Sequence, residues 1–221
     1  MKALALALVL GIGLSAVGSG LRASQQAPSS RPHGQLFPPT DLGLLESPDR
    51  AAWQKPDQIM DALHIADRST VADIGAGAGW FTIQLARRVG PNGVVYAQDV
   101  QREMLESIRR RVTREGLKNV ETKLGSGSNP NLPVAALDAV VVVDAYQEVE
   151  DRVTFLRNLA LALKPSGLIG IVNYKPGRGG PGPAENVRVD KAAVRADAGA
   201  TGLRVVGEEV LPYQYLLVLS R

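Results

Sequence analysis

The sequence predicts an α/β fold whose sheet is organised around a βαβ unit at residues 70–99. Three features of this stretch indicate such a unit. A short apolar run that ends at Asp73-Ile74 has the pattern of a buried strand, and the segment 80–89 has apolar residues at helical spacing. Between them glycines stand at every second position. A second strand pattern, 93–98, completes the unit and ends at Asp99.

The turn of this unit, made by Gly75, Gly77 and Gly79, carries the chemistry of a cofactor site. Glycines let the backbone approach a ligand closely, and the first amides of a helix offer hydrogen-bond donors there. Asp99 ends the second strand, where a carboxylate can accept both hydroxyls of a ribose. The stretch therefore predicts a site for a nucleotide-like cofactor, against the alternative of a tight βα turn with no ligand.

The spacing of the glycines argues against a dinucleotide. The dinucleotide fingerprint is G-x-G-x-x-G, whereas here the third glycine comes one residue early. An acid, Asp73, also stands two residues before Gly75. The pattern Asp-x-Gly-x-Gly-x-Gly resembles motif I of the class I S-adenosylmethionine-dependent methyltransferases, and Asp99 resembles their ribose-binding acid.

This resemblance implies a fold and a cofactor. The fold is a Rossmann-like, seven-stranded sheet in the order 3-2-1-4-5-7-6, with strand 7 antiparallel and helices on both faces. The cofactor is S-adenosyl-L-methionine. The glycine turn would admit its methionine end, Asp73 would anchor its ammonium group through backbone or water contacts, and Val100 or Met104 would pack on its adenine.

The loop at residues 125–130 follows the third predicted strand and is expected near the adenine. Similar methyltransferases usually carry an acid in this loop that hydrogen-bonds the adenine amine. Here Ser128 and Asn129 stand in that region. Because an amide carbonyl can accept such a bond, Asn129 is the expected contact.

Residues 137–143 form a continuous β-branched run, as expected at the centre of a sheet, and end in Asp144-Ala145-Tyr146-Gln147-Glu148. That segment resembles the motif after the fourth strand of the family, which faces the methionine end and the substrate. The resemblance implies that Asp144 lies closest to the methyl group and that Tyr146 offers an aromatic face to the cation. Asp144 and Glu148 are the candidate proton acceptors, although Glu148 also suits the start of a helix.

Gln147 departs from the family pattern, because many similar sequences have His at this position. A glutamine cannot accept a proton at neutral pH, so any role of this position as a base is lost. The departure indicates either a different substrate or a weakened enzyme.

The remaining elements follow from periodicity. Helices are predicted at 57–65, 101–116, 150–164 and 190–200, and strands at 120–124, 168–174, 203–209 and 213–219. Trp53 is either a lid residue or a core anchor. The glycine-proline loop at 175–183 is either a substrate loop or a solvent loop. The ending Leu-Pro-Tyr-Gln-Tyr, at 211–215, resembles that of a bacterial group of predicted, often exported methyltransferases.

Composition narrows the function classes. The 221 residues suffice for one α/β domain with an N-terminal extension, and a net charge of +3 is too mild to indicate a nucleic-acid partner. The chain has no cysteine, which excludes disulfides and thiolate chemistry. Two histidines, His33 and His64, cannot form a metal cluster by themselves, so we expect no metal site.

The N-terminus has the pattern of an export signal. Lys2 precedes an apolar run, and small residues suited to cleavage follow. Residues 3–21 also carry no charge, so an uncleaved anchor that tethers the protein through residues 1–21 is the alternative, and a mis-chosen start is the third. We therefore expect a signal or anchor at 1–24, a linker at 25–48 and a methyltransferase domain at 49–221. The expected location is periplasmic, secreted or anchored at the inner membrane, or cytoplasmic if the start is mis-chosen.

Three functions compete at this point. The leading hypothesis is a methyltransferase that acts on a small molecule by in-line transfer. The second is a protein that binds S-adenosylmethionine with little or no turnover. The departures at Gln147, Ser128 and Ser166 favour it, and the intact glycine motif disfavours it. Ser166 stands in the turn predicted at 164–167, which resembles the family's Leu-Lys-Pro-Gly-Gly turn, and it replaces the first glycine there. The third is a nucleotide-dependent oxidoreductase, which the glycine spacing disfavours.

Overall fold

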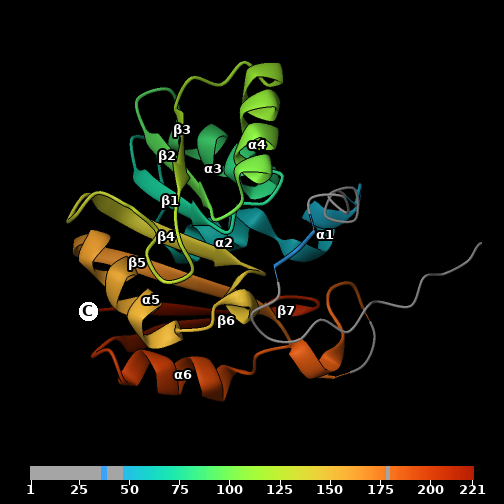
Figure 1. The fold of residues 1–221 in the computed structure, drawn as a ribbon, viewed down its shortest axis with the longest axis vertical. Helices are drawn as coiled ribbons and strands as arrows, with labels where there is room; N and C mark the ends of the chain where they lie inside the picture. The colour runs from blue at the N-terminus through green and yellow to red at the C-terminus, as the bar shows by residue number, and fades with distance from the viewer. Residues whose placement is uncertain (1–35, 39–46, 178–179) are drawn as a thin grey trace, which may run out of the picture.

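The computed structural model describes residues 36–38, 47–177 and 180–221. Seven strands in these ranges form a single sheet, with helices packed around it (Figure 1). The strands are β1 (Thr70–Ile74), β2 (Val94–Asp99), β3 (Val120–Leu124), β4 (Leu137–Val143), β5 (Leu163–Tyr174), β6 (Arg204–Val210) and β7 (Gln214–Ser220). The α-helices are α1 (Arg50–Gln54), α2 (Pro56–Ala62), α3 (Trp80–Val89), α4 (Arg102–Arg114), α5 (Arg152–Ala162) and α6 (Lys191–Gly199). Two single 3-10 turns are η2 (Tyr146–Glu148) and η3 (Glu185–Val187).

The strand order is β3-β2-β1-β4-β5-β7-β6, which confirms the predicted order. The strands β3, β2, β1, β4 and β5 pair in parallel, and β7 pairs antiparallel with both β5 and β6. The reversed last strand is therefore also as predicted. Parallel strands bring their carboxyl ends to one edge, and ligands in such sheets bind at that edge, where the strand order reverses.

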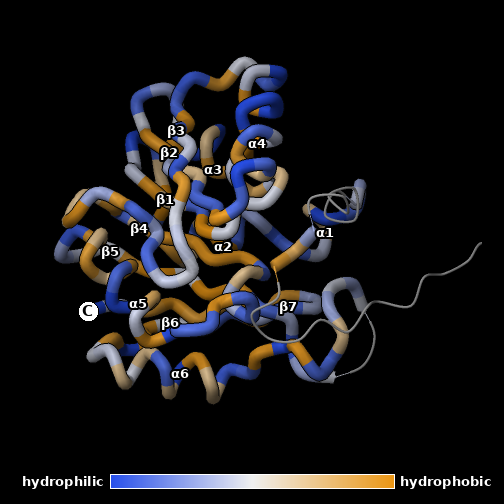
Figure 2. Tube along the Cα trace, viewed as in Figure 1, coloured by the Kyte–Doolittle hydropathy of each residue, from blue (hydrophilic) through white to orange (hydrophobic). Residues whose placement is uncertain are grey.

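Both faces of the sheet are buried by helices (Figure 1). The helices α2 and α3 share one cluster of buried residues with β1, β4 and β7, and α5 and α6 share another on the opposite face. The centre is β4, whose valines are buried on both sides, as the β-branched run predicts. The outer surface of α4 is hydrophilic (Figure 2), while its Met104, Leu105 and Ile108 are buried against the sheet.

Local sequence signals explain where several elements begin. Asp151 caps α5 by accepting a hydrogen bond from the backbone of Thr154, and Asp190 caps α6 in the same way from Ala193. One element begins earlier than predicted: β5 starts at Leu163 rather than at residue 168, since Leu163 pairs with Leu137 before a shift in register. The predicted turn at 164–167 is therefore part of an irregular strand.

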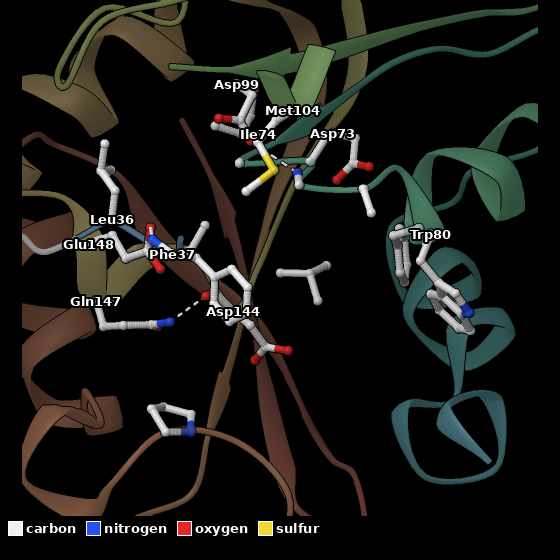
Figure 3. Close-up of a pocket in the computed structure, with 18 of the residues that line it drawn as sticks. Leu36, Phe37, Asp73, Ile74, Trp80, Asp99, Met104, Asp144, Gln147 and Glu148 are labelled. Carbon is white, nitrogen blue, oxygen red and sulfur yellow. Dashed lines mark hydrogen bonds between the residues drawn. The ribbon is translucent and has the colours of Figure 1, made fainter. Parts of the chain in front are cut away.

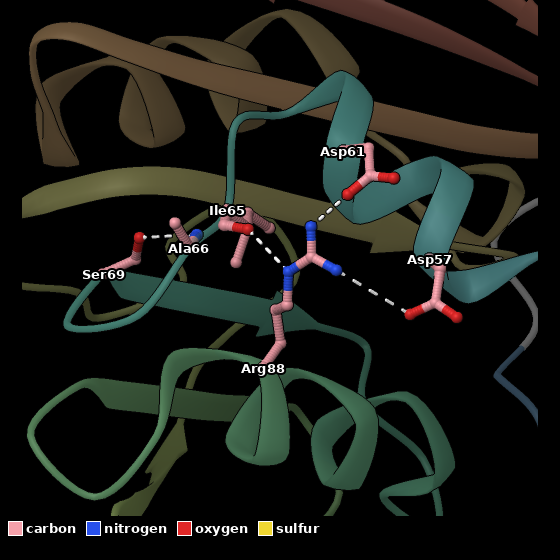
Figure 4. Close-up of polar contacts among 6 residues, drawn as sticks. All are labelled: Asp57, Asp61, Ile65, Ala66, Ser69 and Arg88. Carbon is pink, nitrogen blue, oxygen red and sulfur yellow. Dashed lines mark hydrogen bonds and ion pairs between the residues drawn. The ribbon is translucent and has the colours of Figure 1, made fainter.

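The helix α2 is attached to α3 through one arginine (Figure 4). The guanidinium of Arg88 donates to the carbonyl of Ile65 over 2.9 Å and forms ion pairs with Asp61 and, at 3.9 Å, with Asp57. A single left-handed residue, Lys55, joins α2 to α1. This chain of contacts fixes α1 at the carboxyl edge of the sheet.

The predicted signal or anchor at 1–24 lies outside the described residues, as does most of the predicted linker at 25–48. Within the part of the chain that the structure describes, no helix combines the length and the apolar character needed to cross a membrane.

Candidate functional site

A cavity of about 780 Å³ lies at the carboxyl ends of β1, β2 and β4 (Figure 3). Its volume is within the range of about 300–1,000 Å³ that is typical of small-molecule sites. Two sets of residues line it. The first comes from the glycine turn after β1 and from the end of β2; the second comes from α1, from the ends of β4 and β5, and from the segments before η3 and β7.

The glycine turn brings backbone to the wall of the cavity. Gly75 and Gly77 line it and have positive φ angles of 66° and 55°, which L-residues with side chains adopt only at a cost. A Cβ at Gly75 would lie 2.4 Å from the Cβ of Ala145, so the turn also packs directly on the segment after β4.

Gly79, the third glycine of the turn, lies outside the cavity wall. It is the residue before α3, its added Cβ would meet Ile108 of α4 at 3.1 Å, and it is not among the cavity-lining residues. Gly79, which was predicted to contact a cofactor, thus lies where α3 packs closely on α4.

Asp99 points into the cavity from the end of β2 (Figure 3). Its Oδ2 accepts a hydrogen bond from the backbone N–H of Gly77 over 3.0 Å, and its Oδ1 accepts one from Gln101 over 2.9 Å. Burial raises the pKa of this carboxyl, and hydrogen bonds from the backbone of Gln101, Gly77 and Val100 oppose the rise. The carboxylate is thus fixed beside the glycine turn with a lone pair on each oxygen left for a ligand. Val100 and Met104 line the wall next to it.

Asp73 lines the cavity from the end of β1 and is almost fully buried. Its Oδ2 accepts a hydrogen bond from the Thr82 hydroxyl over 2.6 Å. Burial raises its pKa to about 6, while the Thr82 bond and the charge of Arg50 lower it. A cationic group in the cavity would favour the ionised form.

Asp144 is held by amides from two distant parts of the chain. Its Oδ1 accepts a hydrogen bond from Gln214 over 2.5 Å, and its Oδ2 accepts one from Gln54 over 3.2 Å. Its φ of 56° lies in the left-handed region, which Asp tolerates better than most residues. The side-chain amide of Gln147 donates to its backbone carbonyl and braces this turn (Figure 3).

The orientation of these amides is set by Arg50. Its Nε can only donate, and it donates to Oε1 of Gln54 over 2.5 Å. The amide nitrogen of Gln54 therefore faces Asp144 and the Oε1 of Gln214, 3.2 Å away, and Gln214 in turn presents its nitrogen to Asp144. The network thus presents a donor to each oxygen of Asp144, which favours the ionised carboxylate.

Burial raises the pKa of Asp144 to about 6, and the charge of Arg50 and the two amides oppose the rise. Burial also lowers the pKa of Arg50, whose guanidinium lies 4.5 Å from the centre of the Trp80 ring. At neutral pH Asp144 is therefore mostly ionised, with a pKa close enough to neutrality to take up a proton.

Glu148 and Gln101 hold a short N-terminal segment against the cavity. The backbone N–H of Phe37 donates to Glu148 over 3.3 Å, and the Gln101 amide donates to the carbonyl of Phe37 over 2.9 Å. Leu36 and Phe37 line the cavity beside Glu148 (Figure 3). These residues fall in the stretch predicted as a linker, and here they form part of the wall instead.

Two site residues predicted from the sequence lie elsewhere. Tyr146 is fully buried beneath the cavity; its ring packs on Phe155, and its hydroxyl donates to Asp197 of α6 over 2.9 Å. The side chain of Tyr146 turns into the core, so its ring does not face the cavity. The prediction that it offers an aromatic face to the methyl cation is therefore wrong.

Asn129, the residue predicted to contact an adenine, lies outside the cavity wall. Its Oδ1 accepts a hydrogen bond from the backbone of Asn131 over 2.9 Å, which closes a local turn, and the residue does not line the cavity. From the same loop Ser126 and Gly127 reach the wall instead.

The structure places Trp53 and part of the loop at 175–183, whose roles the sequence left open. Trp53 lines the cavity from α1, and Pro181, Gly182 and Pro183 line it from the loop. Sequence reasoning missed the structural partners of Asp144: Gln54 and Gln214 lie 160 positions apart, and although Gln214 stands in the Leu-Pro-Tyr-Gln-Tyr run, nothing in that run pointed to the site. Among the described residues no group of three or more His, Asp or Glu side chains is placed to hold a metal ion.

The comparisons with known proteins agree with this geometry. A family model described as a methyltransferase domain matches residues 71–167, which run from β1 into β5. A solved S-adenosylmethionine-dependent methyltransferase from Aquifex aeolicus superposes with a TM-score of 0.79 and 28% identity, over 83% of this chain and 98% of that chain.

Two curated proteins are also similar. The nocamycin O-methyltransferase of Saccharothrix syringae is 30% identical over 104 residues, 47% of this chain and 37% of that protein. The demethylmenaquinone methyltransferase of Geobacillus stearothermophilus is 29% identical over 116 residues, 52% of this chain and 49% of that protein. The chain thus spans half or less of the length of these two relatives.

The fold and the site define a cofactor-binding α/β protein with a glycine turn and a ribose-type acid at the switch point of its sheet. Residues 71–167 match a methyltransferase domain, and the seven-stranded sheet has the fold of the class I S-adenosylmethionine-dependent methyltransferases.

Proposed function

We propose that the protein is an enzyme that transfers a methyl group in line from S-adenosylmethionine to a small molecule. The observation that carries this proposal is the single cavity that joins the glycine turn and Asp99 to the carboxylate of Asp144. A cofactor at the first end (the cofactor end) and a methyl acceptor at the second (the acceptor end) share one cavity. Proximity and orientation of this kind can supply about 7–11 kcal/mol of a reaction barrier.

The residues of the first end fit the cofactor. Asp99 has acceptor oxygens for two ribose hydroxyls, and Val100 and Met104 offer an apolar surface for the adenine. Asp73 offers a buried negative charge for the ammonium group, and the backbone at Gly75 and Gly77 leaves room for the methionine end. When bound, S-adenosylmethionine supplies an electrophilic methyl group on a sulfonium.

At the second end we assign the proton acceptor to Asp144. The carboxylate faces the cavity, accepts hydrogen bonds on both oxygens and has a pKa of about 6. Glu148 remains a second candidate for a proton acceptor, although it also holds Phe37. A proton acceptor is needed only if the acceptor atom carries a proton that must leave.

A small-molecule acceptor is supported by what encloses this end. Residues of α1, of the segment 181–183 and of the segment 36–37 all line the cavity. The two curated relatives carry the names of methyltransferases for nocamycin and demethylmenaquinone, which are small molecules. We propose no nucleic-acid partner.

A second candidate function is binding of the cofactor without turnover. One observation favours it: Gln147 uses its side-chain amide to brace the backbone of Asp144 and contributes no base. Such a protein would retain the cofactor end and lack transfer.

Two measurements separate these functions. Calorimetry with S-adenosylhomocysteine on the full-length protein tests the cofactor end, and transfer of label from methyl-labelled cofactor into a bacterial metabolite extract tests turnover. Binding together with transfer supports the enzyme, and binding without transfer in any extract supports the second candidate. The absence of binding would contradict both.

We also propose that the protein belongs to an exported group and acts outside the cytoplasm, either free or tethered through residues 1–21. The basic start, the apolar run and the small residues that follow support this proposal. A reporter that is active only in the periplasm, fused after Ser24, is expected to be active. An inactive periplasmic reporter with an active cytoplasmic one would contradict export.

A further inference from the structure

Three aromatic rings meet at the acceptor end of the cavity. Trp53 comes from α1, Tyr174 ends β5, and Tyr213 precedes β7. The ring centre of Trp53 lies 6.1 Å from that of Tyr174 and 6.1 Å from that of Tyr213, in tilted and edge-on geometry. All three side chains line the cavity, and Tyr213 keeps 43% of its surface exposed.

The glycine-proline segment at 180–183 completes this aromatic wall. A Cβ at Gly180 would come within 2.8 Å of the Tyr213 ring, and a Cβ at Gly182 within 2.5 Å of the Tyr174 ring. The two glycines thus let the backbone lie directly on the rings. Pro181 and Pro183 then face the cavity and add flat apolar surface.

Arg188 holds this segment in place. Its guanidinium donates to the carbonyls of Pro183, Lys175 and Gly177, each over 3.0 Å, and lies 5.5 Å from the centre of the Tyr174 ring. One side chain therefore ties both ends of the loop to the aromatic wall.

The charges around the wall disfavour a cationic acceptor. An aromatic face attracts a cation, but here the guanidinium of Arg188 already lies over Tyr174, one of the three rings, and that of Arg50 lies over Trp80, which also lines the cavity. A second cation between them would be repelled by both. The apolar surface therefore suits an uncharged ring that stacks on the aromatic side chains.

One polar group faces this apolar wall. The backbone N–H of Asp144 donates to Val172 over 2.9 Å, which sets its carboxylate next to the end of β5 and Tyr174. Its oxygens can only accept hydrogen bonds, so the matching group on a ligand is a donor. An alcohol or phenol is such a ligand, because its O–H donates a hydrogen bond and its oxygen becomes a nucleophile once the proton passes to a carboxylate.

We infer that the methyl acceptor is a planar, uncharged ring compound with a hydroxyl group, whose ring lies against Trp53, Tyr174 and the segment 181–183 and whose hydroxyl donates to Asp144. This inference rests on the proposed function. In the reaction the hydroxyl oxygen bonds to the methyl carbon while the carbon–sulfur bond breaks, and its electron pair stays on sulfur. The hydroxyl proton passes to Asp144.

The test compares four probes of similar size by calorimetry on the full-length protein, saturated with S-adenosylhomocysteine. Naphthol has the ring and the hydroxyl, naphthalene lacks the hydroxyl, decahydronaphthol lacks the planar ring, and naphthylmethylamine is a planar cation. We expect naphthol to bind about tenfold or more tightly than each of the others, since a hydrogen bond to a charged group and ring stacking are each worth roughly that factor.

Variants locate the site. Tyr213→Leu and Trp53→Leu should each weaken naphthol binding several-fold, and Asp144→Asn should abolish the preference for naphthol over naphthalene. Tyr96→Leu is the matched control, because this tyrosine lies on β2 outside the cavity. The exposed position of Tyr213 keeps the test independent of folding.

The outcomes separate the inference from the proposed function. If S-adenosylhomocysteine binds but the cation or decahydronaphthol binds as well as naphthol, or Tyr96→Leu weakens naphthol as much as Tyr213→Leu does, the ring acceptor is wrong and the methyltransferase proposal stands. If S-adenosylhomocysteine itself does not bind the wild-type protein, both are wrong.

Discussion

The two ends of the cavity are assembled from the chain in different ways. At the cofactor end, Asp73, the glycine turn, Asp99 and Met104 all come from one stretch of about thirty residues that forms a single βαβ unit and the start of α4. At the acceptor end, the wall and the network around Asp144 combine residues that range from Arg50 in α1 to Gln214 in β7.

This difference has a physical consequence. The cofactor end depends on local geometry, because a strand, a turn and a helix fix it wherever the sheet forms. The acceptor end depends on α1, β4, β5 and β7 meeting, so it is sensitive to changes in any of them. Substitutions at the two ends should therefore separate affinity for S-adenosylhomocysteine from the behaviour of Asp144.

The largest loss of stability is expected at Gly75, where the glycine turn of the cofactor end packs on the segment after β4. Gly75→Ala would bring a Cβ within 2.4 Å of Ala145 at a φ of 66°. Overpacking costs about 1–3 kcal/mol and a left-handed residue with a side chain about 1–2 kcal/mol, so we expect the free energy of unfolding to fall by about 2–5 kcal/mol.

Urea denaturation measures this loss. Gly127→Ala is the matched control, since Gly127 also lines the cavity but an added Cβ would meet nothing within 4 Å. Its stability should change by less than about 0.5 kcal/mol. Equal stability of the two variants would show that the turn does not need its close approach to the segment after β4.

The next effect concerns the cofactor end alone. Asp99→Ala removes the charged acceptor beside the glycine turn, a loss of about 1.5–3 kcal/mol for a charge-assisted bond. We expect S-adenosylhomocysteine to bind roughly 10- to 150-fold more weakly, because about 1.4 kcal/mol corresponds to a factor of ten. Calorimetry measures the affinity.

Asp67→Ala is the control for this change, as it removes an exposed carboxylate that does not line the cavity. Affinity unchanged in Asp99→Ala would place the ligand elsewhere. Since Asp99 also accepts two backbone hydrogen bonds, a thermal melt with each titration checks that the variant is folded.

A third prediction concerns the acceptor end alone. Gln214→Leu and Gln54→Leu each remove a donor to Asp144 and leave one oxygen of this half-buried carboxyl without that partner. We expect each to lower the free energy of unfolding by about 1–3 kcal/mol. Because the two amides also bond each other, the double variant should lose less than the sum, by about 0.5 kcal/mol or more.

Gln58→Leu on the surface of α2 is the control, with a change of about 0.5 kcal/mol or less. The same variants should raise the pH at which methyl transfer begins, because fewer donors stabilise the ionised carboxylate. Additive losses without a shift in the pH profile would contradict the network.

The smallest effect is the dependence of stability on pH. Burial raises the pKa of Asp73 and of Asp144 to about 6 in the folded protein. Between about pH 4 and 6 the folded state thus holds protons that the unfolded chain has released, so the free energy of unfolding should fall as the pH rises through this window and then level off.

Asp144→Asn removes one of the two titrating groups and should reduce this fall. We expect a difference of about 1 kcal/mol or less, because Asp144 is only partly buried and solvent screens its charge. Denaturation at several pH values on both proteins measures it. Identical pH profiles of wild type and variant would show that the pKa of Asp144 is not raised.

The fold was largely readable from the sequence. The glycine turn, the valine-rich run of β4 and the caps of α5 and α6 are local patterns, and the strand order followed from the family resemblance that they support. The start of β5 was misjudged, because pairing of Leu163 with Leu137 extends the strand across a sequence that looks like a turn.

At the site, the sequence by itself determined the cofactor end, because Asp73, Gly75, Gly77 and Asp99 are brought together by a single supersecondary unit whose geometry depends on nearby residues. Only the tertiary structure decided which way the side chains after β4 and β3 point. Tyr146 turns into the core to reach Asp197 on α6, Asn129 closes its own loop, and Gln54 and Gln214 converge on Asp144. These contacts join residues far apart in the chain, and their energies depend on how helices and strands pack, which no local pattern of residues encodes.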